Sequence, residues 1–305
     1  MSLMAASPIP LPLERGAFCV SIDVERLWGV WDVLTERDRR HASLEGPILE
    51  ELVQLLDEYG VPATFALVGR LLDDSPGFDG LTGPASHWHA PETLELLRSS
   101  ATDHEIGTHT HAHPYFHQIS EAAARRDLER ARDLHARLGL PFESLVFPRN
   151  QVAHLEVLAE LGLRVFRSVD AGWLMRCERR APRLRPAANL IDKALAIPAP
   201  LVTPLLHPKG LVELPSSTLL MGRNGLRAAI HPALVRRKLS SGLRRAAEAR
   251  QLFHLWFHPS NFYFDARTQF AALEAALREA AALRDAGRLE LRTMGSFAAG
   301  PAAGA

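Results

Sequence analysis

The chain of 305 residues has few cysteines and no long apolar run. Its two cysteines, Cys19 and Cys177, lie far apart and form no C-x-x-C pair, which excludes a disulfide framework and argues against structural zinc on thiolates. No apolar segment approaches the ~20 residues that span a bilayer. Prolines also interrupt the N-terminal segment where a signal peptide would be apolar. We therefore expect a cytoplasmic protein without stable membrane insertion.

The sequence also has no excess of positively or negatively charged residues. The chain has 35 Lys and Arg residues against 35 Asp and Glu residues, so its formal net charge is zero. No global field then attracts nucleic acid, and we expect no nucleic-acid partner. Arginines do cluster in "RCERRAPRLR" at 176–185 and in "VRRKL" at 235–239. Such clusters are either solvated faces or contacts for an anionic ligand such as a phosphate.

Several well-known catalytic motifs are absent. The sequence has no G-x-S-x-G elbow, no P-loop and no G-x-G-x-x-G segment. Serine hydrolase, nucleotide hydrolase and dinucleotide-binding functions therefore have little support.

Apolar runs typical of buried strands alternate with segments of helical periodicity, which predicts a parallel α/β sheet or barrel. We expect a single domain over 1–297, an irregular insertion at about 180–240 and a flexible tail at 298–305. The expected strands lie within 17–25, 62–69, 104–113, 144–150, 164–170 and 253–261, and the expected helices within 45–60, 90–100, 120–140, 152–163 and 268–287.

Reactive side chains follow several of these strands. Asp23 and Glu25 end the first one, two residues apart, and on a strand both would point to the same side with Cα atoms about 6.6 Å apart. Two carboxylates that close repel each other unless a positive group lies beside them. The alternative is a strand that runs out into solvent, where the acids would be harmless.

The segment "HEIGTHTHAHPYFH" contains five of the fourteen histidines. His109 and His113 are spaced i,i+4, so a turn or an irregular strand end can bring both imidazoles to one metal ion. A carboxylate could be the third ligand, which leaves an open position for water. A solvated histidine-rich loop is the alternative, but the Asp-x-Glu strand end favours a metal site.

His258 follows the very apolar strand of "LWFHPSN". A buried histidine is often only a satisfied core residue. Pro259 directly after it indicates a strand end, however, where a histidine can face a cleft.

Together these segments resemble the polysaccharide deacetylase superfamily, which is the NodB-homology or carbohydrate esterase family four group. "SIDVE" resembles the first motif in its D-x-E form, "PATFALVG" the following strand, and "HEIGTHTHAH" the histidine motif. "FPRNQ" stands where the family has an arginine motif, and "LWFHP" resembles the late histidine motif.

The resemblance implies a distorted (β/α) barrel with fewer than eight parallel strands and one divalent metal ion, usually Zn²⁺. It implies hydrolysis of an N-acetyl group on a sugar, with Asp23 as base, His258 as acid, and Glu25, His109 and His113 as metal ligands. Arg149 would be the partner of Asp23. We expect Asn150 and Gln151 near the substrate, with a backbone N–H near Asn150 stabilising the oxyanion.

Three alternatives stay open at this point. The same fold could hydrolyse a non-sugar C–N bond, such as a cyclic amide or ureide. A deacetylase homologue could bind glycans without turnover. Asp23 and Glu25 could also be a glycosidase pair in a true eight-stranded barrel. For the favoured function the partner is an acetylated sugar, and the arginines of 176–185 would suit one that bears phosphate.

Overall fold

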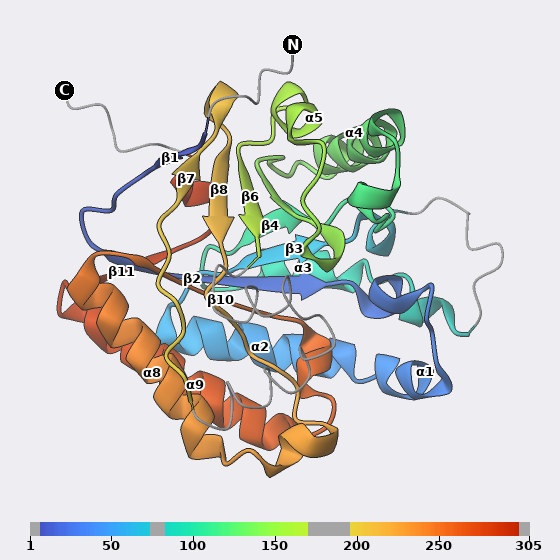
Figure 1. The fold of residues 1–305 in the computed structure, drawn as a ribbon. Helices are drawn as coiled ribbons and strands as arrows, with labels where there is room; N and C mark the ends of the chain where they lie inside the picture. The colour runs from blue at the N-terminus through green and yellow to red at the C-terminus, as the bar shows by residue number, and fades with distance from the viewer. Residues whose placement is uncertain (1–6, 74–82, 170–195, 299–305) are drawn as a thin grey trace.

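A computed structural model of the chain describes residues 7–73, 83–169 and 196–298, and one curled sheet runs through them (Figure 1). The strand order is β1-β7-β8-β6-β5-β4-β3-β2-β10-β9, and β11 pairs with β2 beside this path. The strands are β1 (Ile9–Pro10), β2 (Gly16–Val24), β3 (Thr64–Leu67), β4 (Glu105–Thr108), β5 (Ser144–Val146), β6 (Val165–Ser168), β7 (Leu205–Leu206), β8 (Val212–Pro215), β9 (Thr218–Leu219), β10 (Leu252–Phe257) and β11 (Leu289–Arg292).

Strand β2 lies at the centre of this sheet and all nine of its residues are buried. On one edge it pairs with β10, and on the other its first half pairs with β11 and its second half with β3. All strand pairs from β8 to β9 along the path are parallel, whereas β1–β7 and β7–β8 are antiparallel. The continuous apolar run of 17–25 is therefore explained by burial on both faces.

The expected distorted (β/α) barrel is confirmed. Its longer parallel strands number fewer than eight, as expected, but short or lateral strands add to them. Within the described residues, seven parallel strands of three or more residues follow one another from β8 to β10. The two-residue β9 and the lateral β11 add two more parallel strands. The path ends at β1 and β9, which do not pair in the described structure, so this sheet is curled rather than closed.

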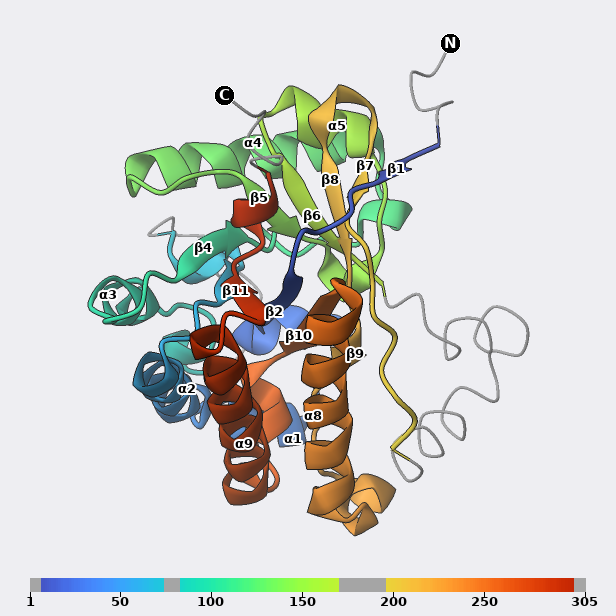
Figure 2. The same ribbon diagram turned by 90° about the vertical axis from the view of Figure 1, so that its left-hand side faces the viewer.

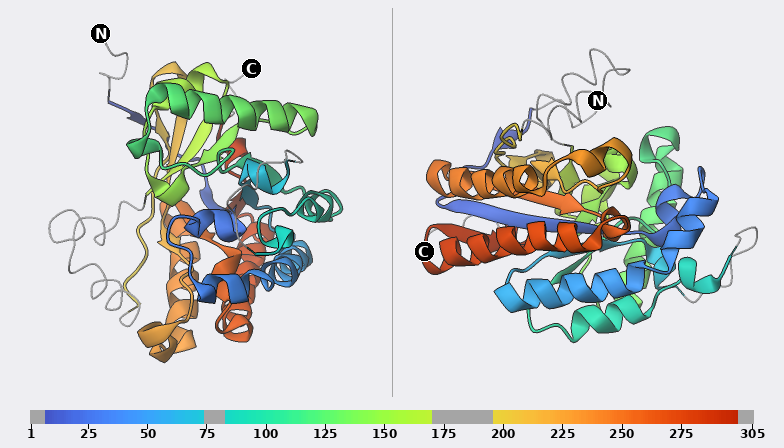
Figure 3. Two further views of the ribbon diagram at one scale, coloured as in Figure 1. Left: turned by 90° about the vertical axis from the view of Figure 1, so that its right-hand side faces the viewer. Right: turned by 90° about the horizontal axis from the view of Figure 1, so that it is seen from below.

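Helices cover the outside of the curled sheet. α2, α8 and α9 lie side by side, as the view from below shows (Figure 3), whereas α4 and α5 lie near β5 and β6 (Figure 2). The helices with described bounds are α1 (Glu36–Ala42), α2 (Glu45–Tyr59), α3 (Glu92–Arg98), α4 (Glu121–Arg137), α5 (Leu155–Glu160), α8 (Pro232–Ala249) and α9 (Ala266–Asp285).

The helices begin and end where the sequence signals predict. Ser120 caps α4 by accepting a hydrogen bond from the backbone N–H of Ala123. Gly60 ends α2 in the left-handed conformation with a φ of 57°. Apolar residues of α2 recur at helical spacing on its buried face, namely Ile48, Leu49, Leu52, Val53 and Leu56.

The segment expected to be an irregular insertion at about 180–240 belongs to the sheet in its described part, so that expectation is wrong there. β8 pairs with β6 and β9 pairs with β10. These strands are only two to four residues long and leave no periodic pattern to recognise. Residues 170–195 and most of the expected tail lie outside the described residues. None of the described helices is long and apolar enough to cross a membrane.

The contact of α8 with β10 depends on Gly242. A Cβ atom at this position would lie 2.6 Å from the ring of the buried Phe253. We expect Gly242→Ala to lower the free energy of unfolding by about 1–3 kcal/mol, the range for overpacking a core, as measured by urea denaturation.

Gly46, near the start of α2, is the matched control, because a Cβ atom there meets nothing within 4 Å. Gly46→Ala should leave stability unchanged or raise it by up to about 1 kcal/mol. Equal effects of the two changes would show that α8 moves away from β10 at no cost.

Candidate metal centre and active site

The polar side chains expected at the strand ends meet at one rim of the curled sheet. Asp23 is the last residue but one of β2 and Glu25 follows this strand, while His109 follows β4 and His258 follows β10. Because these strands are parallel, their carboxyl ends lie on the same side, where sites form in α/β folds.

Glu25, His109 and His113 form a compact cluster of possible ligands. Glu25 Oε2 lies 3.2 Å from His109 Nε2 and 3.1 Å from His113 Nε2, and one ligand atom from each residue lies within 4.8 Å of the others. Ligands about 2.1 Å from a tetrahedral zinc ion would lie about 3.4 Å apart. The spacing of the three groups therefore fits a single cation.

The two imidazoles are suited to a cation for different reasons. His109 Nδ1 lies 2.8 Å from the backbone oxygen of Val146 and donates to it, which leaves the lone pair of Nε2 facing Glu25. His113 Nε2 lies 3.1 Å from Glu25 Oε2 without the geometry of a hydrogen bond, and neither of the buried ring nitrogens of His113 has another partner among the described residues. An unpartnered buried nitrogen is costly, and a metal ion at this point would satisfy it.

Glu25 is held as a carboxylate. Burial would raise its pKa, but the charge of His258 and the contacts with His109 and His113 bring the pKa well below its usual value. Burial lowers the pKa of His113, against the opposing effect of Glu25. An ionised carboxylate and a neutral imidazole are the forms that bind metal ions.

The backbone of the histidine loop is strained. Thr110 and His113 have φ values of 67° and 55°, a region that β-branched residues such as threonine rarely adopt. The Thr110 side-chain oxygen accepts a hydrogen bond of 3.1 Å from the backbone N–H of His113. Each such conformation costs on the order of 1–3 kcal/mol and is typical of functional sites.

The carboxylate of Asp23 forms a bidentate ion pair with Arg167 of β6. Arg167 Nη1 lies 2.7 Å from Asp23 Oδ1, and Nη2 lies 2.6 Å from Oδ2. The Arg167 side chain is fully buried, with 0% exposed. Burial would raise the pKa of Asp23, but the charge of Arg167, followed by that of His258, lowers it overall. Asp23 is therefore ionised and able to accept a proton.

Further groups fix the guanidinium of Arg167 within the interior. Asn150 Oδ1 accepts from Nε at 3.1 Å and from Nη2 at 2.8 Å, and the ring of Trp256 lies 4.3 Å from the guanidinium carbon. Ser21 accepts from Nη1 at 3.0 Å, so its own hydroxyl can donate to His254 Nε2, 2.9 Å away. Burial, and then the charge of Arg167, lower the pKa of His254 to about 3.

The expected partnership of Arg149 with Asp23 is wrong. Arg149 Nη2 instead binds Asp32 Oδ1 at 2.9 Å, and its guanidinium lies over the ring of Tyr115. The physical reason is the turn after β5, where Arg149 and Asn150 have φ values of 52° and 54°, so the two side chains diverge. Only Asn150 reaches Arg167.

The sequence does contain an indication of the role of Arg167, although this residue belongs to none of the motifs discussed above. It lies inside the apolar strand of "RVFRS", and an arginine buried in a strand needs an acidic partner. The buried strand of 17–25 ends in the acids that could supply one.

The structure does not support the expectation that a backbone N–H near Asn150 stabilises the oxyanion. The backbone N–H of Asn150 donates to the Phe147 oxygen at 2.8 Å, and that of Gln151 donates to the Pro148 oxygen at 3.2 Å. Both amides are thus already bound within the turn. Gln151 Oε1 is buried and has no hydrogen-bond partner among the described residues.

His258 lies between the acid pair and the ligand cluster. Its Nε2 atom is 3.6 Å from Asp23 Oδ2 and 3.5 Å from Glu25 Oε1, and 22% of its side chain is exposed. Asn261 Oδ1 accepts from its backbone N–H at 2.9 Å, which fixes this strand end. The imidazole can therefore reach a ligand that enters from solvent.

The other three histidines of the cluster lie elsewhere. His104 Nδ1 accepts from the backbone N–H of Ala63 at 3.2 Å, and His111 Nε2 lies 3.0 Å from Asp73 Oδ2. His117 is exposed beside Gln118. Of the five imidazoles, only those of His109 and His113 reach Glu25 in the described structure.

Residues 45–166 match the family model described as polysaccharide deacetylase. The matched range contains His109 and His113 but not Asp23, Glu25 or His258, which the fold brings to the same rim. This part of the chain is therefore similar to the polysaccharide deacetylase family, as the sequence motifs indicated. No curated protein sequence matches the chain.

Solved structures share this fold over nearly the whole chain. A protein named as a polysaccharide deacetylase from Mycobacterium smegmatis is 20% identical with a TM-score of 0.64, covering 97% of this chain and 94% of its own. One from Pseudomonas aeruginosa PAO1 is 13% identical with a TM-score of 0.62, covering 92% and 89%. Puue allantoinase, at 10% identity, reaches a TM-score of 0.61 over 98% and 95%. At these identities the likeness concerns the fold.

The ligand cluster predicts how the metal content of variants will change. We expect His109→Ala and His113→Ala to lose a bound divalent ion, because each removes one of three ligands. Elemental analysis after dialysis against a trace of Zn²⁺ measures this directly. His117→Ala is the matched control and should keep close to one ion per chain; full occupancy in a His109→Ala/His113→Ala double variant would refute the site.

The buried ion pair predicts a large loss of stability for a change at Arg167. Arg167→Met leaves the Asp23 charge buried without its partner and should lower the free energy of unfolding by about 3–5 kcal/mol. Arg149→Met removes the partly exposed pair with Asp32 and the contact with the Tyr115 ring and should cost about 1–2 kcal/mol or less. Urea denaturation at pH 7 compares the two, and equal losses would contradict the central position of Arg167.

Proposed function

We propose that the protein is a zinc-dependent hydrolase that removes an N-acetyl group from an amino sugar of a glycan or glycan precursor. The observation that supports this most strongly is the ligand cluster of Glu25, His109 and His113 with Asp23 and His258 beside it. Two imidazole nitrogens and one carboxylate suit zinc and leave room for water and substrate. The match of residues 45–166 to the polysaccharide deacetylase family model supports the class of substrate.

The metal would be held by Glu25, His109 and His113. When bound, it would polarise the acyl oxygen and make a water molecule more acidic. Asp23 would accept the proton of the attacking water, and its low pKa, maintained by Arg167 against the effect of burial, would keep it ionised for this step.

His258 would complete the reaction by donating a proton to the departing amine, which leaves poorly without one. Its position between Asp23 and Glu25 and its partial exposure support that role. Arg167 does not touch solvent, so its role would be to position Asp23 and hold its charge. These assignments use only side chains that meet at one rim.

Release of acetate from N-acetylated amino sugars tests the proposal. We expect metal-loaded protein to release acetate, and Asp23→Asn to reduce the rate by at least about 10²-fold while keeping its metal, because an amide cannot accept the proton. Asp133→Asn, a change of an exposed acid on α4, is the control and should leave the rate unchanged.

The same assay separates the alternatives. Hydrolysis of a cyclic ureide without acetate release from any N-acetyl sugar would replace the proposed function. Absence of turnover of both substrate classes with the metal in place would favour a non-catalytic glycan-binding protein. Full activity after complete removal of metal would contradict the proposed chemistry.

A further inference from the structure

A solvent-open cavity of about 730 Å³ begins at Glu25 and carries positive charge on its walls. Arg37 of α1 and Arg227, which precedes α8, both line it. Of the other ionic groups there, Arg26 is paired with Glu92 at 2.7 Å, and Asp38 caps α1 by accepting from the backbone N–H of Thr35.

Neither Arg37 nor Arg227 has an acidic partner within the described part of the chain. The guanidinium of Arg37 lies 4.3 Å from the ring centre of Phe264, and Arg227 makes one long hydrogen bond of 3.4 Å to Asn224 Oδ1. Guanidinium groups in this condition keep most of their N–H donors available, and their planar geometry matches phosphate or carboxylate oxygens.

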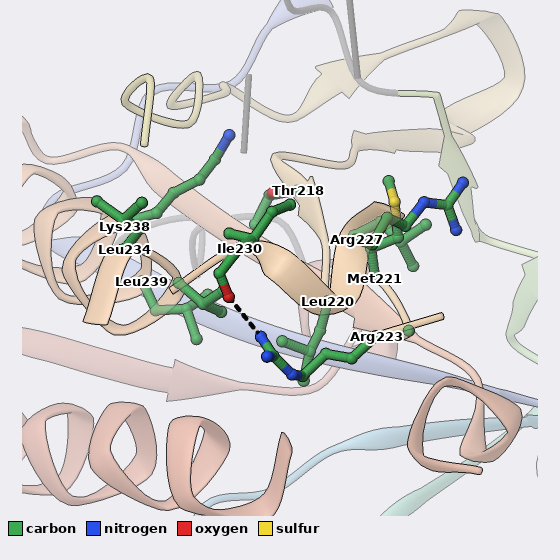
Figure 4. Close-up of a pocket in the computed structure, with 12 residues that line it drawn as sticks. Thr218, Leu220, Met221, Arg223, Arg227, Ile230, Leu234, Lys238 and Leu239 are labelled. Carbon is green, nitrogen blue, oxygen red and sulfur yellow. Dashed lines mark hydrogen bonds between the residues drawn. The ribbon is translucent and has the colours of Figure 1, made fainter. Parts of the chain in front are cut away.

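A second cavity adjoins the first one and is mostly apolar, although Arg223, Arg227 and Lys238 also line it. It lies between helix α8 on one side and β9 with the following segment on the other. Its lining includes Leu220, Met221, Leu234 and Leu239 (Figure 4). The space between these walls is about 510 Å³ with open solvent included, of which about 40 Å³ can hold the centre of a water-sized molecule, and no acidic residue of the described chain lines it. This cavity contains none of the groups of the metal centre, so the proposed hydrolysis does not explain it.

The two cavities share Gly222 and Arg227 as lining residues. Arg223, which also lines the second cavity, has a structural role. It binds Asp265 at 2.7 Å, and it donates to the Ile230 oxygen, a contact marked in Figure 4. A ligand that extends from Glu25 would thus pass Arg227 and then meet the apolar slot. Along this path a ligand would first meet Glu25 of the metal centre, then the arginine side chains, and finally the apolar side chains of the second cavity.

We propose that the substrate is an N-acylated sugar joined through an anionic group to an apolar chain. The acyl group would lie at the metal centre, the anionic group at Arg37 and Arg227, and the chain in the slot between β9 and α8. The placement of the acyl group rests on the proposed function. The anion and chain sites rest on the two cavities alone and can be tested without turnover.

Binding of simple probes to the metal-loaded protein tests these two sites. Octyl phosphate carries both features, inorganic phosphate only the charge, and octyl glucoside only the chain. Isothermal titration calorimetry below the micelle concentration should show octyl phosphate binding at least about tenfold more tightly than either other probe, because burying even a few methylene groups contributes that much. Affinity equal to that of either single-feature probe would overturn the proposal.

Variants locate the two contacts. Arg227→Gln and Arg37→Gln should each weaken octyl phosphate by about five- to tenfold, and added salt should weaken it too because both side chains are exposed. Leu234→Gln should weaken octyl phosphate and leave inorganic phosphate unchanged. Arg236→Gln is the matched control, since this exposed arginine of α8 lines neither cavity.

The outcomes separate this inference from the proposed function. If octyl phosphate binds equally to wild type, Arg37→Gln and Arg227→Gln, the probe sits on the metal and the inference is wrong. If octyl phosphate does not bind through these contacts, but the protein still releases acetate from neutral sugars, only the inference is overturned. The expected binding pattern without any acetate release would overturn only the proposed function.

Discussion

The ion pair between Asp23 and Arg167 is the interaction on which the shape of the site depends. The two residues lie on β2 and β6, which are separated by three strands in the sheet. In a flat sheet these strands would be about 19 Å apart at a spacing of about 4.8 Å, far beyond the reach of an arginine. Their contact at 2.6 Å therefore requires a strongly curled sheet, and the same curl brings β4 and β10 to the rim where the histidines meet.

The curled interior also decides the chemistry of Asp23. A carboxylate buried without a partner would take up a proton, and it could then not act as a base at neutral pH. Arg167 prevents this, and Ser21, Asn150 and Trp256 hold its guanidinium from the other sides. In the histidine loop, Thr110 and His113 adopt backbone conformations with positive φ that are locally unfavourable. The surrounding structure therefore maintains this strain, which places the imidazoles beside Glu25.

Much of this arrangement could be predicted from the sequence. Apolar runs and helical periodicity located the main strands and helices. The histidine spacing indicated a metal site with a carboxylate as third ligand, and the family resemblance singled out Glu25 to join His109 and His113. Arg149 was misplaced because two left-handed residues turn its side chain away, and no sequence pattern records such a turn. Arg167 was missed because its partner lies 144 residues away, and β7 to β9 were missed because such short strands have no period.

The divided edge of β2 has a consequence for the order in which the protein can form. β3 covers the second half of this edge, but β11 and β10 come from the far end of the described chain, and Ser21 meets His254 across 233 residues. During synthesis the strand that carries Asp23 therefore has one whole edge and half of the other unpaired until β10 and β11 have been made. Contacts of such long sequence separation slow folding, and exposed strand edges are prone to wrong pairing meanwhile. The carboxylate needed for chemistry is made more than 200 residues before the strands that complete its surroundings.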